Sequence, residues 1–143
     1  MNEGNTWSTA FLPDGDTRSA TLSVNGYGLS CDVPIDPEPD PGAPTPMGLL
    51  AASLSACTAM SVRTFLRRWQ IPPGEVHVRV SVLPGPEPAL HREVRVHGAV
   101  EPELREQLAS VVDSTPVTTL LRASLTIRTV LHIGMSPVHG PRP

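Results

Sequence analysis

The sequence predicts an α+β fold in which antiparallel strands surround one long, buried helix. Three features carry this prediction: an Asn25-Gly26 turn between alternating segments, a long apolar segment at 47–69, and two valine-rich alternating segments after it. With 143 residues, the chain has the length of one domain, and we expect a single domain over 1–143. Its composition, 39% hydrophobic and 17% charged, is typical of a soluble globular protein.

The N-terminal third is expected to form three antiparallel strands, at 6–11, 17–24 and 27–33. Asn25-Gly26 is a strong hairpin signal between the last two, because both turn positions need positive φ. Segment 34–46 then repeats proline between acidic residues. Because proline cannot donate ladder hydrogen bonds, we expect an extended surface connector there and not a domain boundary.

The segment 47–69 predicts the central helix. One stripe at helical spacing joins Leu50, Leu54, Cys57, Ser61 and Phe65. The first half of the helix is apolar or small on every side, which predicts burial in the core. The second half is amphipathic, with Arg63, Arg67 and Arg68 expected to face solvent, and Pro72-Pro73-Gly74 ends the helix.

The rest of the chain alternates between strands and helices. Further strands are expected at 76–82, 93–100 and 125–131, a helix at 104–112, and a frayed tail at 135–143. Each of the first two strands has one buried valine face and one polar face. Pro102 opens the helix beside acidic residues, and Thr115 is expected to cap a short turn that follows it.

Charge and motif content exclude several functional classes. The formal net charge is −3 and basic residues do not cluster, so no nucleic-acid partner is expected. The longest apolar stretch, 47–60, has about 14 residues, whereas a membrane span needs about 20. The five histidines show no metal-ligand spacing with the cysteines, and cofactor motifs are absent, so no metal or other cofactor is expected. Without an export signal, we expect a cytoplasmic protein whose two cysteines are free thiols.

The segment 46–63 carries a more specific signal. Its sequence, PMGLLAASLSACTAMSVR, resembles the central-helix signature of the OsmC/Ohr family, the osmotically inducible and organic hydroperoxide resistance proteins. The later strands, the helix at 104–112 and the turn at Thr115 have counterparts in that family, so the resemblance covers nearly the whole chain. It implies an intertwined homodimer, with the central helices in the dimer core and the thiol sites at the subunit interface.

The resemblance also implies roles for particular residues. Cys57 occupies the position of the peroxide-reacting cysteine, and Arg18 corresponds to the strand arginine that steadies its thiolate in the family. The family's glutamate, which holds that arginine, would directly follow Pro46, where this chain has Met47. The family's second, resolving cysteine corresponds to Thr115 in this chain.

Thiol chemistry sets one requirement for Cys57. The thiolate is the nucleophile, and burial among apolar neighbours disfavours a charged group, so a nearby cation is needed. Arg18 is the expected cation, held by another acid, by a backbone carbonyl, or by nothing. Cys31 is expected to be a structural thiol, and it could replace the resolving cysteine only if its Cα lies within about 7 Å of that of Cys57.

The leading hypothesis is therefore the reduction of organic hydroperoxides through Cys57. With threonine at the resolving position, the expected route uses one cysteine and an external dithiol, such as a dihydrolipoyl protein. An apolar substrate pocket is expected, which favours alkyl or lipid hydroperoxides. The alternative is a non-catalytic homodimer that binds a small apolar or thiol ligand at its interface, or an inert dimer; Met47 and Thr115 favour the alternative.

Overall fold

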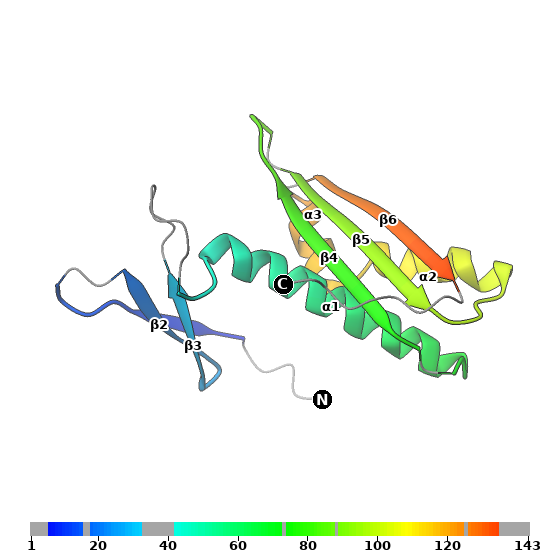
Figure 1. Ribbon diagram of the computed structural model, residues 1–143, viewed down its shortest axis with the longest axis horizontal. Coiled ribbons are helices and arrows are strands. Elements are labelled where there is room, and N and C mark those ends of the chain that lie inside the picture. Colours follow the sequence, from blue (N-terminus) through cyan, green and yellow to red (C-terminus); the bar gives the residue numbers. More distant parts are fainter. Residues whose placement is uncertain are drawn as a thin grey trace. The chain divides into compact units, whose positions relative to one another are not determined.

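The described part of the chain forms two sheets and three helices (Figure 1). The computed structural model describes residues 6–15, 18–32, 42–72, 74–87, 89–124 and 126–134. These residues divide into two compact units, Met1–Leu50 and Ala51–Pro143, and each unit is described by itself. Helices and antiparallel strand pairs occur together, so the predicted α+β class is confirmed. The single domain over 1–143 stays a prediction.

The N-terminal unit contains an antiparallel sheet of three strands. These are β1 (Ser8–Phe11), β2 (Ser19–Val24) and β3 (Tyr27–Asp32), in the order β1-β2-β3. Asn25 and Gly26 have φ of 46° and 91°, which confirms the predicted hairpin turn. The side-chain carbonyl of Asn25 also accepts a hydrogen bond of 3.0 Å from the Trp7 amide, so the turn residue fixes the neighbouring segment as well.

The second sheet contains β4 (Val76–Leu83), β5 (Ala89–His97) and β6 (Thr126–Gly134), in the order β4-β5-β6. The pair β4–β5 is antiparallel as expected, but β5–β6 is parallel. The helices α2 (Pro102–Asp113) and α3 (Pro116–Arg122) lie between β5 and β6 in the chain. This helical crossover returns the chain to the same end of the sheet, as a parallel pair requires.

The core of the second unit lies between one face of this sheet and the helices. Buried side chains from β5, α1 (Pro46–Arg68) and α2 form one cluster. Its members are Val62, Phe65, Leu66, Val94, Val96, Val100, Leu108 and Val112. The strand β5 begins at Ala89, four residues before the expected start, and its even-numbered residues point into the core. The valine alternation therefore predicted the buried face correctly and the boundary incorrectly.

The buried stripe of α1 is rotated from the predicted one. The buried residues are Leu54, Thr58, Val62, Phe65 and Leu66. Leu54 and Phe65 were predicted, but Thr58 and Val62 lie against the sheet in place of Cys57 and Ser61, which are half-buried. Positions 54, 58, 62 and 66 are four residues apart. Because an α-helix has 3.6 residues per turn, they lie on one face, and the stripe rotates only slowly around the helix axis.

The first half of α1 is not buried on every side within this single chain. Leu54 is fully buried, but Met47 is 51% exposed, and Ala52, Ser53 and Ala56 are exposed as well. An 18-residue window of α1 has a mean hydropathy of 1.4, so by length and composition the helix could cross a membrane. The core helix of a globular protein passes the same test, and α1 packs its buried stripe against a sheet.

The end of α1 is fixed by a contact that the sequence did not predict. Arg63 was expected only to face solvent, but its guanidinium donates a 2.7 Å hydrogen bond to the carbonyl oxygen of Gly74. Arg67 and Arg68 are exposed as predicted. At the other end, Thr45 caps the helix, because its hydroxyl accepts a 3.1 Å hydrogen bond from the Gly48 amide.

Three predicted segments lie outside the described residues. They are most of the connector at 34–46, the tail at 135–143 and Leu125 in the last predicted strand. The described end of the connector includes Pro44, whose carbonyl accepts a 2.9 Å hydrogen bond from the Asp32 amide. This bond lies within the N-terminal unit, where it joins the start of α1 to the end of β3.

We predict that Gly74→Ala destabilises the fold. A Cβ atom at Gly74 would lie 1.7 Å from the carbonyl oxygen of His97, and that backbone atom is held in a strand. The free energy of unfolding should fall by about 3 kcal/mol, the upper range for overpacked sites. Urea unfolding measures the loss. Gly98→Ala is the matched control, because its nearest neighbour would be Ile71 at 3.8 Å. Equal stability of the two variants would contradict the prediction.

Candidate functional site

A buried arginine on β5 organises the site. Arg92 precedes Val94 by two residues, so its side chain shares the inward face of the strand. It is fully buried, with no solvent exposure. Its direct partners in the two ladders are Val80 on β4 and Thr129 on β6. A guanidinium in this place must find all of its hydrogen-bond acceptors inside the protein.

Three threonine hydroxyls supply these acceptors. Thr129 accepts from Nε at 3.1 Å and from one terminal nitrogen at 2.9 Å. Thr58 and Thr118 accept from the other terminal nitrogen, at 3.1 and 2.6 Å. The three threonines belong to β6, α1 and α3, so one side chain joins three elements to β5. Every buried polar side-chain atom in the described part of the chain has a partner.

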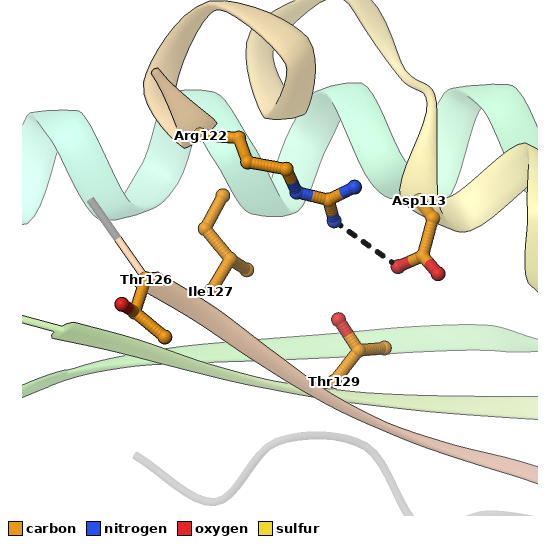
Figure 2. Close-up of a pocket in the computed structure, with 5 residues that line it drawn as sticks. All are labelled: Asp113, Arg122, Thr126, Ile127 and Thr129. Carbon is orange, nitrogen blue, oxygen red and sulfur yellow. Dashed lines mark hydrogen bonds and ion pairs between the residues drawn. The ribbon is translucent and has the colours of Figure 1, made fainter. Parts of the chain in front are cut away.

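A carboxylate at the end of α2 completes the surroundings of Arg92. Asp113 Oδ1 lies 3.7 Å from Arg92 and 3.3 Å from Arg122 of α3. Figure 2 shows Arg122 and Asp113 pointing toward one another above Thr129. Burial is the largest effect on the Arg92 guanidinium and lowers its pKa below the usual value, while the negative charge of Asp113 partly opposes that lowering.

Thr115 belongs to the same hydrogen-bond network. Thr115 is 2% exposed and is the N-cap of α3, which confirms its predicted capping role. Its hydroxyl accepts a 3.4 Å hydrogen bond from the Thr118 amide and lies 2.6 Å from the Thr118 hydroxyl. Because Thr118 in turn accepts from Arg92, the network runs from Thr115 to Arg92 through a single residue.

Cys57 directly precedes Thr58, a member of this network, in the chain. It is a free, half-buried thiol on α1. Thr58 donates a 2.7 Å hydrogen bond to the Leu54 carbonyl and accepts one from Arg92, so the turn of helix that carries Cys57 is fixed at its neighbour. Among the described residues, no group of three His, Cys, Asp or Glu side chains could hold a metal ion.

The other predicted site residues lie in the N-terminal unit. Arg18 directly precedes β2 and is exposed. Cys31 is buried on β3 opposite Ala20, as expected for a structural thiol. Met47 is in the first turn of α1. Their distances to Cys57 depend on how the two units are placed, so the predicted pairing of Arg18 with Cys57 and the possible role of Cys31 as a second thiol stay predictions.

A shallow cavity opens beside the charged end of the network. It has a volume of about 550 Å³ and is lined by Asp113, Arg122, Thr126, Ile127 and Thr129 (Figure 2). Two of these residues, Asp113 and Thr129, also contact Arg92. Cys57 is not one of the five, and the lining is mostly polar. This cavity is therefore not the apolar substrate pocket that the sequence led us to expect.

Sequence reasoning missed Arg92, although the sequence contains a signal for it. Arg92 alternates in phase with Leu90, Val94 and Val96, and all four side chains are buried. Placing the start of the strand at residue 93 left Arg92 in the preceding turn. A charged residue in phase with a buried face is rare, and it indicates either a wrong register or a site with internal partners.

Together, these features define an α+β protein with a free thiol on its central helix and a buried arginine that is hydrogen-bonded to the residue after that thiol. The family model described as OsmC-like protein matches residues 39–130. The chain therefore belongs to the OsmC-like protein family, as its central-helix sequence predicted. No curated protein sequence matches the chain significantly.

Solved structures show the same fold. An OsmC-like protein from Mycoplasma pneumoniae has a TM-score of 0.76 at 17% identity, covering 92% of this chain and 99% of its own. An organic hydroperoxide resistance protein from Elizabethkingia anophelis has a TM-score of 0.71 at 17% identity, with coverages of 93% and 99%. The organic hydroperoxide resistance protein OsmC from Legionella pneumophila has a TM-score of 0.65 at 18% identity, with coverages of 92% and 99%. At sequence identities of 17–18%, these comparisons show a shared fold alone.

We predict that Thr58→Val destabilises the protein through Arg92. Valine keeps the shape of threonine but leaves one buried guanidinium hydrogen without its acceptor. The free energy of unfolding should fall by about 1–3 kcal/mol, as measured by urea unfolding at fixed protein concentration. Thr64→Val is the matched control, because Thr64 makes the same bond to the carbonyl four residues back on an exposed face. The prediction is wrong if both variants lose the same stability.

Proposed function

We propose that this protein reduces organic hydroperoxides through Cys57 as part of oxidative stress defence. The observation that carries the proposal is a free, half-buried thiol on the central helix of a chain of the OsmC-like family. Similar structures include organic hydroperoxide resistance proteins, which supports the same reaction class. The proposed location is the cytoplasm, where a free thiol stays reduced.

The proposed first step consumes the peroxide. The Cys57 thiolate attacks the terminal oxygen of the hydroperoxide, the O–O bond breaks, and the alkoxide leaves and takes a proton from water to become an alcohol. Cys57 becomes a sulfenic acid, oxidised by two electrons. No charged residue occurs between Met47 and Val62 on α1, so the neighbours of Cys57 along the helix favour alkyl over small polar peroxides.

The proposed second step uses an external dithiol. One thiol of the reductant attacks the sulfenic sulfur and releases water, which forms a mixed disulfide with Cys57. The second thiol of the reductant then displaces Cys57 as a thiol and closes its own disulfide. A dihydrolipoyl protein has the required pair of thiols. Thr115 supports this one-cysteine route, because a hydroxyl at the resolving position cannot form the disulfide within the chain.

The proposed assembly is a homodimer in which partner chains cover α1. Met47 and Met60 on this helix are more than half exposed in the single chain, and Ala52, Ser53 and Ala56 are exposed between them. A surface of this kind is typical of a protein–protein interface. The family resemblance supports the same assembly.

We predict that Met60→Glu weakens the dimer. A buried, unpaired carboxylate costs about 3 kcal/mol or more, which corresponds to at least a hundredfold rise in the dissociation constant. Light scattering during size-exclusion chromatography should give twice 15.3 kDa for the native chain and a lower mass for the variant at micromolar concentration. Leu120→Glu is the control. Leu120 is also an exposed apolar residue but lies on α3 and not on α1, so this variant should keep the mass of the dimer. A monomeric native protein would refute the proposed assembly.

The second candidate function is a non-catalytic dimer that binds a small apolar or thiol ligand. Two observations favour it: Met47 stands at the family's glutamate position, and Thr115 is fully engaged as a helix cap and network member. A peroxide assay with a sulfenic-acid trap separates the two functions, because only the enzyme consumes peroxide and forms the trapped adduct at Cys57.

We predict stoichiometric oxidation of Cys57 by one equivalent of cumene hydroperoxide. A dimedone adduct should appear at Cys57 by mass spectrometry within the dead time of manual mixing, and dihydrolipoamide should support turnover. Cys57→Ser should abolish peroxide consumption, whereas Cys31→Ser should keep at least about half of it because Cys31 is a structural thiol. A reduced Cys57 in the presence of remaining peroxide would exclude the enzyme. A Cys31–Cys57 disulfide would exclude the one-cysteine route and indicate a two-cysteine cycle.

A further inference from the structure

The outward side of the second sheet concentrates histidine. The four histidines in the described part of the chain all lie on it: His77 of β4, His91 and His97 of β5, and His132 of β6. They alternate with the residues of the same strands that pack into the core, so their side chains point away from the core and from α1. Histidine is the side chain whose charge changes between pH 5 and 8. We call this surface, with Glu75 at the start of β4, the histidine face.

Three arginines share the histidine face. Arg79 lies on β4, Arg95 on β5 and Arg128 on β6, and all three are exposed. Neither Arg79 nor Arg128 makes an ion pair with another described residue. The turn that joins β4 to β5 adds one acidic residue, Glu87, beyond the ends of both strands. The two outer strands thus each present an unpaired positive charge.

Two glutamates compensate part of this charge. Glu75 lies 3.1 Å from His77, and Glu93 on β5 pairs with Arg95 and, at 3.2 Å, with His132. Three arginines against two glutamates leave the histidine face with a formal charge of +1 when the histidines are neutral, and four protonated histidines raise it to +5. The whole chain carries −3, so the fold gathers positive charge on this surface.

The pairing register places basic residues directly opposite one another. His91 is opposite Arg128, and Arg95 is opposite His77 on one side and His132 on the other. Neighbouring strands are about 4.8 Å apart, and like charges in opposing positions destabilise a sheet. Protonation of these histidines therefore puts positive charge beside positive charge, which a bound anion would offset. By linkage, an anionic partner binds more tightly to the protonated face.

The composition of the histidine face fits carboxylates of a protein better than a nucleic acid. None of its outward positions on the described strands is Phe, Tyr or Trp, so bases of a single strand have no such ring on which to stack. Glu93 lies on the middle strand, where it would repel a backbone with a phosphate at every nucleotide. A protein segment can place a neutral or basic residue against Glu93 and carboxylates against the arginines and histidines around it.

We propose that the histidine face is a docking surface for a carboxylate-rich segment of a partner protein, and that its affinity for this segment rises as the pH falls from 7.5 to 6. The sign follows from the charges, because protonation changes the face from nearly neutral to strongly positive. The docking surface is independent of the proposed reaction of Cys57, since α1 packs against the opposite face of the sheet.

The test measures binding of a rhodamine-labelled peptide of ten glutamates to the full chain by fluorescence anisotropy in 20 mM salt. The peptide stays ionised at pH 6, since glutamate has an ordinary pKa of about 4.3, so a change in affinity above that pH comes from the protein. The Kd should fall at least about tenfold between pH 7.5 and pH 6.0. Raising the salt to 0.5 M should weaken binding, because the charges are exposed.

Two double variants separate the arginines from the histidines. Arg79→Gln with Arg128→Gln should raise the Kd at least about fivefold at every pH, because two unpaired positive charges are lost. His91→Gln with His97→Gln should reduce the pH effect to about threefold or less, since neither histidine has an acidic partner among the described residues. Circular dichroism at both pH values confirms that each variant is folded.

Arg67→Gln with Arg68→Gln is the matched control, because it removes the same charge from the exposed end of α1. Its Kd should stay within about twofold of the native value. An equal loss in this control would overturn the proposal, because the attraction would then depend on net charge alone. A Kd that does not change with pH, or no binding at pH 6.0, would also overturn it. Tighter binding of a labelled strand of ten thymidines would overturn the choice of partner and identify a nucleic-acid surface.

Discussion

A guanidinium without access to water has to be surrounded by acceptors, and Arg92 obtains them from separate parts of the second unit. Thr129 comes from the neighbouring strand, Thr58 from the central helix and Thr118 from the short helix that precedes β6. Each of these elements must place its threonine within hydrogen-bonding distance of the guanidinium. The cost of burying this one charge therefore makes the arrangement of the helices on the sheet specific, in addition to the packing of valines and leucines.

Most of the fold was predictable because its determinants are local or periodic. The alternation of Val76, Val78 and Val80 identified a half-buried strand, and Asn25-Gly26 identified the hairpin through its need for positive φ. The alternation of buried and exposed residues does not show whether two strands pair parallel or antiparallel. The parallel contact of β5 with β6 arises from the two helices that intervene, and the length of that crossover is visible only after its helices are recognised.

The candidate site was predicted less completely than the fold. Cys57 could be found through the sequence of its helix, but its half-buried place depends on which helical face the sheet covers, and Thr58 takes the covered position. Arg92 was missed because a charged residue near a turn is ordinarily a solvated one. Its burial depends on partners 26 to 37 residues away in the chain, which no local pattern encodes.

The choice of threonine around Arg92 has a chemical consequence. A hydroxyl does not ionise in the physiological range, and peroxides do not oxidise it, unlike a thiol at the same place. The partners that orient the guanidinium thus remain the same whether Cys57 is a thiol, a thiolate or an oxygenated acid. Thr115, a further threonine of the network, extends this property to the N-cap of α3. The threonines of this network are therefore chemically inert toward oxidants, unlike the free Cys57 thiol that directly precedes one of them in the chain.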